Sequence, residues 1–366
     1  MKVNVMFDSK KPFNELPLLP PGIDVETRAV LKKAIGANRA LTELKGLGLT
    51  IPNQALLVDS LILQEAKASS EIENIITTND ALYKAFTART SKIDPATKEV
   101  LRYREALWEG YHQLKRKPVM STNLFIKIVQ IIKQNQAGIR KTPGTAVVNE
   151  TSGEVIYTPP EGEDIIREKL KNLEAFIHAE DDMDPLVKLA LIHYQFEAIH
   201  PFTDGNGRTG RIINILFLTF KGLLDLPVLY LSKAIIERKR DYYRLLREVT
   251  EKGQWEPWIL FMLGAIEETS EFTRKRIIAI RDLMEETMQK ARQELPRRVY
   301  SKELIELLFR QPYCKIAFLV DAGIASRNIA ARYLKELVTI DILKPYRVGN
   351  ETLYLNWKLF ELLSGK

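Results

Sequence analysis

The chain has 366 residues, 45% of them hydrophobic, and its 54 Lys and Arg against 47 Asp and Glu give a formal net charge of +7. This length predicts two or three globular domains, and basic residues spread among acidic ones indicate a charged surface and not a nucleic-acid-binding face. The single cysteine, Cys314, excludes an internal disulfide and a multi-cysteine metal site, and we expect a cytoplasmic protein without a secretory segment or a membrane span.

The N-terminal part of the chain changes character near residue 24. The first 20 or so residues contain Pro12, Pro17 and Pro20 and predict an extended segment that wraps around the rest. From about residue 24 to residue 115, hydrophobic residues recur at helical spacing. This region includes a serine pair followed by carboxylates, on a helix that we predict over about residues 60–78. Taken alone, that pattern indicates a solvated helix face.

A β-hairpin is predicted next. Two β-prone runs, at residues 145–149 and 154–158, are separated by a short polar stretch and followed by Pro159-Pro160. Taken alone, such a hairpin is an ordinary surface feature.

Two helices joined by a glycine-rich connector follow. Helical spacing runs from Leu186 to Ile199 and again from Ile212 to Phe220. The connector is His200-Pro201-Phe202-Thr203-Asp204-Gly205-Asn206-Gly207-Arg208-Thr209-Gly210-Arg211. Backbone N–H groups of a Gly-Asn-Gly turn can form an anion-binding nest, and the following helix N-terminus strengthens it. The connector therefore predicts a phosphate site, whereas His193, inside the first helix, is expected to be a hydrogen-bonded core histidine.

The connector also carries side chains suited to phosphate chemistry. Arg208 and Arg211 can make bidentate contacts with phosphate oxygens, and Asp204 is a hard oxygen ligand suited to Mg²⁺. His200 can accept a proton from an incoming hydroxyl. The glycines also fit the dinucleotide-binding fingerprint, but here they follow a helix and not a strand. The other alternative is a purely structural loop.

The last part of the chain predicts a long amphipathic segment that ends near Pro296, then a separate small domain. A Tyr242-Tyr243 pair, of a kind that usually packs in a core, precedes the long segment. Residues 299–366 predict helices near 301–309, 316–321 and 326–338 and a hairpin within 342–355, which is the order of a winged helix. Five basic residues on the third helix and the wing can meet DNA phosphates: Arg327, Arg332, Lys335, Lys344 and Arg347. The ten Lys and Arg against seven Asp and Glu in this region are a weak excess for a DNA reader, so protein docking stays an equal alternative.

The connector matches the HPFx(D/E)GNGRxxR signature of the Fic family without a departure, and the chain resembles Fic proteins that are protein adenylyltransferases. The resemblance implies transfer of AMP from ATP to a Ser, Thr or Tyr hydroxyl of a target protein, with release of pyrophosphate. It also implies a mainly α fold, with a Fic-type helical core and a β-hairpin flap.

The resemblance also assigns roles to residues. It implies His200 as the catalytic base, Asp204 as the ligand of Mg²⁺ (with Mn²⁺ as an alternative metal) and Phe202 as a buried loop anchor. The Tyr pair is included in the nucleotide site because such a pair lines the adenine pocket in the family. The implied ATP-binding residues are Gly205, Asn206, Gly207, Arg208, Thr209, Gly210, Arg211, Tyr242 and Tyr243.

Two upstream segments gain a meaning from the same resemblance. The stretch at residues 69–74 resembles the inhibitory (S/T)xxxE(G/N) helix of the family, with Ser69, Glu73 and Asn74 at the motif positions. In the family this glutamate pairs with the second motif arginine, here Arg211, so that the ATP γ-phosphate cannot settle. The predicted hairpin corresponds to a flap that binds the target by strand addition, and we expect its edge at Val147, Val148 and Asn149.

We therefore expect three domains: an N-terminal helical region (1–115) with the inhibitory helix, a Fic catalytic core (116–298) and a winged-helix domain (299–366). Two alternatives to AMP transfer stay open. One is removal of AMP, or transfer of another phosphate-linked group, on the same site. The other is a DNA-binding regulator that acts through the winged helix. The expected partner is a target protein, with self-modification and a homodimer as further options.

Overall fold

The structure is a computed structural model that describes residues 7–49, 54–87, 93–148, 153–349 and 351–365. Fifteen helices lie within these ranges: α1 (Arg28–Leu49), α2 (Gln54–Ile72), α3 (Asn79–Thr87), α4 (Pro95–Arg116), α5 (Thr122–Lys133), α6 (Glu163–His178), α7 (Pro185–Ile199), α8 (Asn206–Phe220), α9 (Leu231–Glu237), α10 (Lys239–Lys252), α11 (Trp255–Glu294), α12 (Lys302–Leu308), α13 (Ile316–Asp321), α14 (Arg327–Thr339) and α15 (Trp357–Ser364). Five short strands accompany them: β1 (Val147–Val148), β2 (Val155–Tyr157), β3 (Tyr313–Cys314), β4 (Lys344–Val348) and β5 (Glu351–Leu355). This confirms the predicted mainly α fold class.

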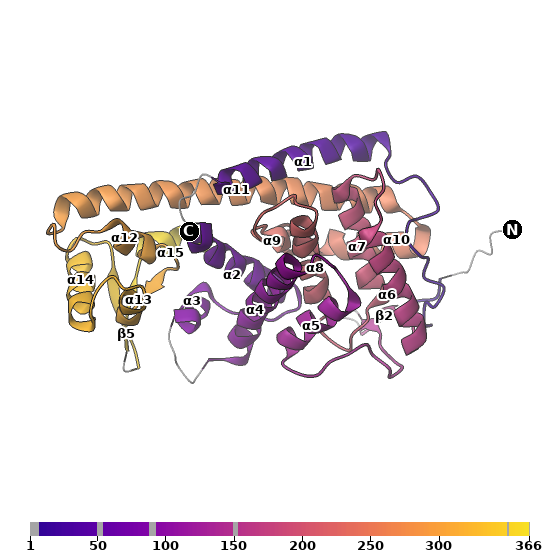
Figure 1. The fold of residues 1–366 in the computed structure, drawn as a ribbon. Coiled ribbons are helices and arrows are strands. Elements are labelled where there is room, and N and C mark those ends of the chain that lie inside the picture. The colour runs from indigo at the N-terminus through magenta and orange to yellow at the C-terminus, as the bar shows by residue number, and fades with distance from the viewer. Residues whose placement is uncertain (1–6, 50–53, 88–92, 149–152, 350, 366) are drawn as a thin grey trace.

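A pair of long helices forms one side of the molecule. The 40-residue helix α11 corresponds to the predicted amphipathic segment, and α1 lies along its first half (Figure 1). The two helices approach closely at Gly36, where a Cβ atom would lie 2.5 Å from the Glu267 carboxylate. Lys33 Nζ forms an ion pair with the same carboxylate at 2.5 Å. The glycine thus lets the two helices pack together.

Helix α7 leads directly into the glycine-rich connector. Asp184 caps its N-terminus by accepting hydrogen bonds from the N–H groups of Leu186 and Val187, and Pro185 occupies the first turn, which favours helix initiation. Nearly every residue of α7 is buried, and Trp258 of α11 donates an indole hydrogen bond to the Ala190 carbonyl at 2.9 Å. Helix α8 packs beside α7 and is similarly buried. Both helices that flank the connector are therefore held rigidly by the core.

The N-terminal segment wraps around this core as an extended chain, as its prolines predict. Between residue 7 and Arg28 it contains no helix or strand. Side chains of the core bind its backbone, because Lys169 donates to the Leu16 carbonyl at 2.9 Å and Gln195 to the Pro17 carbonyl at 2.8 Å. The segment is thus part of the folded body.

The helix predicted over about residues 60–78 is present but lies about six residues earlier in the chain at both ends. Helix α2 ends at Ile72, and the next helix begins at Asn79. Asn74 has a φ of 59°, the left-handed conformation with which Gly or Asn commonly terminates a helix. Glu73 therefore lies in the turn that follows the helix, not within it.

The predicted hairpin is present. Strands β1 and β2 pair antiparallel, with Val147 opposite Tyr157 and Val148 opposite Val155, and the register shifts between the two pairs. Of the predicted edge residues, Asn149 lies outside the described residues.

The C-terminal region contains the three predicted helices, α12 to α14, and the predicted hairpin, β4–β5. Two elements were not predicted, because β3 is only two residues long and α15 is short. Strand β3 pairs with β5, which gives an antiparallel sheet in the order β3-β5-β4. Asn356 caps α15 by accepting a hydrogen bond from the Leu359 N–H, a signal that the sequence does contain. In the described ranges, none of the helices combines the length and apolar composition that a bilayer crossing requires.

Candidate functional site

The site is built around the turn at which α7 ends. His200 is the residue after the last helical position and has a φ of 49°, and its N–H still donates to the Phe196 carbonyl. The buried side chain of Arg140 holds this turn: its Nε donates to the His200 carbonyl at 2.8 Å, and its Nη2 donates to the carbonyl of Pro160 beside the hairpin. The Arg140 backbone N–H donates to the Pro201 carbonyl at 2.9 Å. One arginine therefore fixes the backbone of the histidine relative to the flap.

The glycine-rich part of the connector is closed by its own side chains. Phe202 is fully buried, as predicted for a loop anchor. The Asn206 amide accepts a hydrogen bond from the Phe202 N–H at 2.9 Å and donates one to the Phe202 carbonyl at 2.7 Å. The side chain of Asn206 is therefore engaged inside the loop, and its N–H group belongs to the helix terminus. Gly205, with a φ of 82°, is the N-cap residue that immediately precedes α8. This arrangement gives the N–H groups at the start of α8 the geometry of an anion site.

Four charged side chains meet beside this helix terminus. Arg208 is almost fully buried and forms ion pairs with Glu99 of α4 and, at 3.6 Å, with Asp204. Lys133 of α5 also contacts both carboxylates, Asp204 at 2.5 Å and Glu99 at 3.2 Å. Burial raises the pKa of Asp204, but hydrogen bonding to Lys133 and the charges of Lys133 and Arg208 outweigh it and hold the pKa below its ordinary value. Asp204 is thus an ionised carboxylate, and its side chain is 62% exposed.

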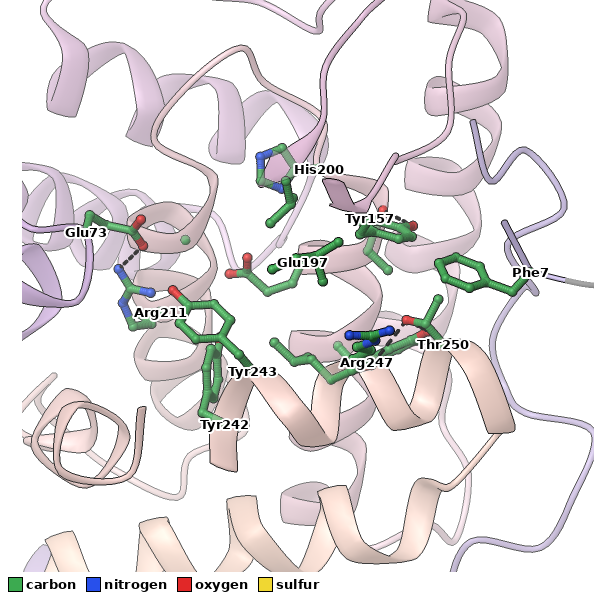
Figure 2. Close-up of a pocket in the computed structure, with 16 residues that line it drawn as sticks. Phe7, Glu73, Tyr157, Glu197, His200, Arg211, Tyr242, Tyr243, Arg247 and Thr250 are labelled. Atoms are coloured by element: carbon green, nitrogen blue, oxygen red, sulfur yellow. Dashed lines mark hydrogen bonds and ion pairs between the residues drawn. The ribbon is translucent and has the colours of Figure 1, made fainter. Parts of the chain in front are cut away.

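Arg211 is bound by the end of α2. Its Nη2 contacts Glu73 Oε1 at 2.8 Å (Figure 2). Its Nε donates to the Ser69 hydroxyl at 2.8 Å. The Ser69 carbonyl accepts a further hydrogen bond from Nη2 at 2.8 Å. The predicted Glu73–Arg211 ion pair is therefore present. A Cβ atom at Gly207 would collide with the Glu73 carboxylate, so the glycine is needed for this close approach.

A cavity extends from this ion pair toward the flap. Its ionic end is lined by Glu73, Gly207 and Arg211, with His200 and Glu197 next to them (Figure 2). Tyr242 and Tyr243 of α10 lie beside Arg211 (Figure 2). The rest of the cavity is mainly aromatic and aliphatic, and it includes Val147, Tyr157 and Tyr194 as well as the α10 residues Leu246, Arg247 and Thr250. The structure thus brings the histidine, the second motif arginine and the tyrosine pair to one hollow.

Other predicted site residues lie around this cavity and not on its wall. Thr209 is fully buried, and Gly210 faces the Glu197 carboxylate, which a Cβ atom would approach to 2.5 Å. Gly205, Asn206 and Arg208 surround the start of α8. Val148 is 47% exposed on the flap.

Burial controls the protonation of the groups along α7. Burial and the charge of Arg140 lower the pKa of His200 to about 4, so its imidazole is neutral at physiological pH. Burial raises the pKa of Glu197 to about 7; the Arg211 charge opposes this shift and the Glu73 charge adds to it. Burial and the Arg211 charge lower the pKa of His193 to about 3, and its Nε2 shares a hydrogen bond with the Tyr242 hydroxyl at 2.9 Å. His193 is therefore the predicted core histidine.

The positive charges around Glu73 favour the ionised form of its carboxyl group. Burial raises its pKa, but the nearby charge of Arg211 and the hydrogen bond to it, together with the charge of Arg208, bring the pKa below the ordinary value. The Arg211 pKa is raised above its ordinary value by Glu73, against the effect of burial. The contact at the ionic end is therefore a charged pair.

A Mg²⁺ ion would fit this site only together with a phosphate-bearing ligand. The described residues contain no group of three or more His, Cys, Asp or Glu side chains that could hold a metal ion. Asp204 offers one ionised, exposed carboxylate. Mg²⁺ is usually held by one or two carboxylates plus substrate phosphates, and this donor set agrees with that pattern.

Several residues of the site were not found from the sequence, among them Glu197, Arg140, Glu99 and Phe7, which lines the cavity beside Tyr157. Glu197 precedes His200 by three positions on the same helix, so helical spacing could have indicated it. Arg140, Glu99 and Phe7 come from distant segments, and no local pattern marks them.

The chain is similar to a known family along most of its length. The Fic/DOC family model matches residues 119–218, the Fic/DOC family N-terminal model matches residues 31–112, and the model of the C-terminal domain of SoFic-like protein adenylyltransferases matches residues 283–359. Together they match more than half of the chain. The described site residues from His200 to Arg211 fall within the central match.

Individual relatives agree with these matches. Protein adenylyltransferase fic-1 of Caenorhabditis elegans is 32% identical over 108 residues, which are 29% of this chain and 20% of the relative. A probable protein adenylyltransferase of Aquifex aeolicus is 26% identical over 197 residues, 53% of this chain and 57% of the relative. The chain therefore spans about a fifth of the first relative and little more than half of the second.

A solved structure shows the same fold. The crystal structure of a Fic family protein from Desulfovibrio desulfuricans superposes with a TM-score of 0.60 and covers 92% of this chain and 98% of that one. The two sequences are 19% identical, so the likeness concerns the fold alone.

Proposed function

This chain belongs to the Fic/DOC family, and we propose that it is a protein adenylyltransferase, which moves AMP from ATP to a Ser, Thr or Tyr hydroxyl of a target protein and releases pyrophosphate. The observation that carries the proposal is the complete connector motif, folded so that a neutral histidine, a helix N-terminus and an arginine meet at one cavity. The names of the relatives support the same activity.

In this mechanism His200 takes the proton of the target hydroxyl. The hydroxyl oxygen attacks the α-phosphorus of ATP, and the bond between that phosphorus and the oxygen bridging to the β-phosphate breaks. A neutral imidazole is the form that can accept the proton, and burial keeps His200 in this form. The start of α8 and Arg211 supply positive charge for the phosphates, since nucleotidyl transfer depends mainly on positioning and charge neutralisation.

We assign Asp204 as the metal ligand, with Mg²⁺ or Mn²⁺ as the ion. When bound, the ion would neutralise phosphate charge. Its support is the single ionised and exposed carboxylate beside the α8 terminus. The neighbouring cations Lys133 and Arg208 keep this carboxylate charged.

We propose that Glu73 inhibits the same site. Its carboxylate and Ser69 occupy the donors of Arg211, and it lies against Gly207 at the start of α8. A phosphate that binds there would meet a like charge in a partly buried place, where such a clash is screened less than at the surface. Productive ATP binding thus requires Glu73 to move away.

The flap and the C-terminal region are assigned to target binding. The exposed Val148 supports strand addition by a target segment along β1. We propose the three domains 1–115, 116–298 and 299–366. The matches that end at residue 112 and begin at residue 119 support the first boundary, whereas the C-terminal match begins at residue 283, within α11. The last of the three domains has the helix order of a winged helix.

DNA contact is a second candidate function of the C-terminal region. Its support is the exposure of Arg327, Arg332 and Lys335 on α14 and of Lys344 and Arg347 on β4. Mobility shifts with duplex DNA at two salt concentrations test it, because phosphate contacts weaken steeply with salt. If no duplex forms a complex with the chain even at low salt, protein docking would remain as the role of the C-terminal region.

The main proposal is tested by incubating the Glu73→Gly variant with labelled ATP and cell lysate. We expect labelled target bands, including the chain itself, whose modified residues gain the mass of AMP on a hydroxyl. An adduct of another mass would show that the chain transfers a different phosphate-linked group. Release of AMP from a modified protein, without transfer, would show that it removes AMP.

A further inference from the structure

The cavity has a wall that comes from the N-terminal segment. Phe7 lines its end farthest from the Glu73–Arg211 pair (Figure 2). The Phe7 ring stacks on Tyr157 of β2, with centroids 6.1 Å apart and planes 17° apart, and meets Phe13 edge-on at 5.4 Å. Tyr157 is itself fixed, because its hydroxyl donates to the Ala198 carbonyl of α7 at 2.7 Å. Phe7 thus stands in a defined place as part of an aromatic cluster.

The segment behind Phe7 is attached to the chain that leaves the flap. The Phe13 N–H donates to the Thr158 carbonyl at 3.0 Å, and the Thr158 hydroxyl donates to the Ser9 carbonyl at 2.7 Å. The Glu161 N–H donates to the Asn14 side chain at 2.8 Å. These three hydrogen bonds hold residues 9–14, the segment that follows Phe7, against the chain that leaves the flap.

The other wall at this end is one face of α10. Tyr243, Leu246, Arg247 and Thr250 line the cavity at helical spacing. Their polar groups already have partners: Arg247 pairs with Glu251 at 2.6 Å, and the Thr250 hydroxyl bonds to Tyr194 at 3.0 Å. What this end offers is mainly flat aromatic and aliphatic surface, which suits a flat ring held by stacking.

These walls lie outside the regions that the family models match. Phe7 precedes the first match, which begins at residue 31, and α10 falls between the matches that end at residue 218 and begin at residue 283. Of the two walls, α10 carries the tyrosine pair that the resemblance already places at the adenine, whereas no family model covers Phe7.

We propose that Phe7 closes a subsite for the base of the bound nucleotide, so that the base lies between the Phe7–Tyr157 side and the α10 face while the phosphates reach α8 and Arg211. The inference rests on the proposed function and adds Phe7 as a specificity-determining residue. It selects ligands that carry an aromatic base over those that carry phosphates alone.

Calorimetric titration of the full chain with ATP and with inorganic tripolyphosphate tests the proposal, in the Glu73→Gly background so that the ionic end is open. We expect Phe7→Ala to weaken ATP binding on the order of tenfold, the effect of losing one stacked ring, and to leave tripolyphosphate binding unchanged. Phe7→Tyr should bind ATP like the parent. Leu18→Ala is the matched control, since Leu18 is exposed in the same segment and does not line this cavity.

Equal ATP affinity in Phe7→Ala and its parent would overturn the proposal, as would an equal loss for ATP and tripolyphosphate. If Phe7→Ala lowers the thermal midpoint, Phe7→Leu carries the test, because it keeps the apolar cover but not the flat ring. A Glu73→Gly chain that binds neither ligand would overturn the proposed function, whereas ring-dependent ATP binding without AMP transfer would overturn the activity and keep the subsite.

Discussion

At the scale of single residues, both the backbone and the side chain of His200 suit the role of catalytic base that we propose for it. The left-handed turn brings the imidazole to the cavity, and Arg140 holds the carbonyl of the same residue. The same arginine lowers the pKa of the imidazole through its charge. One side chain thus positions the base and helps to keep it neutral.

Replacing His200 by Ala should remove AMP transfer and keep ATP binding, because α8 and the arginines stay in place. Loss of a positioned base lowers the rate by on the order of 10²- to 10⁴-fold. Single-turnover transfer in the Glu73→Gly background measures the rate, and calorimetry measures the binding. A variant that transfers AMP at the parent's rate would show that another group is the base.

The pH dependence of transfer should also differ from that of an ordinary histidine. Because the His200 pKa is lowered to about 4, the neutral form persists as the pH falls through 6.5, and kcat/KM should decline only near pH 4. Removing the Arg140 charge takes away part of the shift, so Arg140→Gln should move this acidic limb upward, whereas Arg140→Lys should move it less. An acidic limb near pH 6.5 in the parent would contradict a buried neutral base.

Asp204→Ala should weaken ATP binding and transfer together when Mg²⁺ is present. The variant removes the carboxylate that we assign to the metal and leaves Lys133 and Arg208 to bind phosphate alone. Titrations with ATP in Mg²⁺ and in EDTA measure the difference between the parent and the variant. A parent that transfers AMP at its full rate in EDTA would remove the metal from the mechanism.

At the scale of elements, the end of α2 decides whether Arg211 is available. Because the helix stops at Ile72, Glu73 lies in a turn whose shape depends on the left-handed Asn74. A short turn can release Arg211 without unfolding the helix. The inhibition that we propose would therefore depend on the shape of one helix end.

Glu73→Gly should raise AMP transfer, including onto the chain itself, and Arg211→Ala should lower it with or without Glu73. The first variant frees the guanidinium, and the second removes it from the phosphates. Initial rates with labelled ATP in the two single variants and the double variant check the prediction. A double variant as active as Glu73→Gly alone would show that Arg211 is not needed.

Asn74 provides a milder version of the same test. Asn74→Ala removes the polar side chain that lets Asn adopt the left-handed conformation, which costs about 1 kcal/mol of stability in this turn. We therefore expect the variant to raise basal transfer several-fold. Asn74→Gly suits the same turn and should stay inhibited. Equal basal rates in the Ala and Gly variants would mean that the turn does not control Glu73.

The sequence predicts those site residues that lie close together along the chain. The connector could be interpreted because its base, carboxylate, glycines and arginines all fall between His200 and Arg211. Arg140 and Glu99 reach the same loop from 60 and 109 positions away, so only the fold reveals them. The predicted C-terminal end of α2, near residue 78, is wrong: the helix ends at Ile72, and the left-handed Asn74 is the kind of residue that terminates a helix. The Glu73–Arg211 pair came from the resemblance and not from any local pattern.

At the scale of the whole molecule, the regions are joined by one continuous hydrophobic core. Buried residues from Leu16 to Leu363 form a single cluster, and α11 reaches from the catalytic helices to the C-terminal elements (Figure 1). The C-terminal region also touches the helices that precede the core. Tyr313 of β3 donates a hydrogen bond to Asp80 of α3 at 2.5 Å, and Ser60 of α2 donates to the Arg310 carbonyl at 3.3 Å.

A continuous core predicts that the C-terminal region and the catalytic region unfold together. Tyr313→Phe removes the buried donor of the contact with Asp80 and should lower the free energy of unfolding by about 1–2 kcal/mol. Because the two regions share α11 and the core, the loss should move a single urea transition monitored by far-UV circular dichroism. Tyr346→Phe is the matched control, since Tyr346 is 41% exposed on β4, and it should leave the midpoint unchanged. Two separate transitions, of which Tyr313→Phe moves only one, would show that the C-terminal region folds on its own and is joined to the catalytic body only by α11.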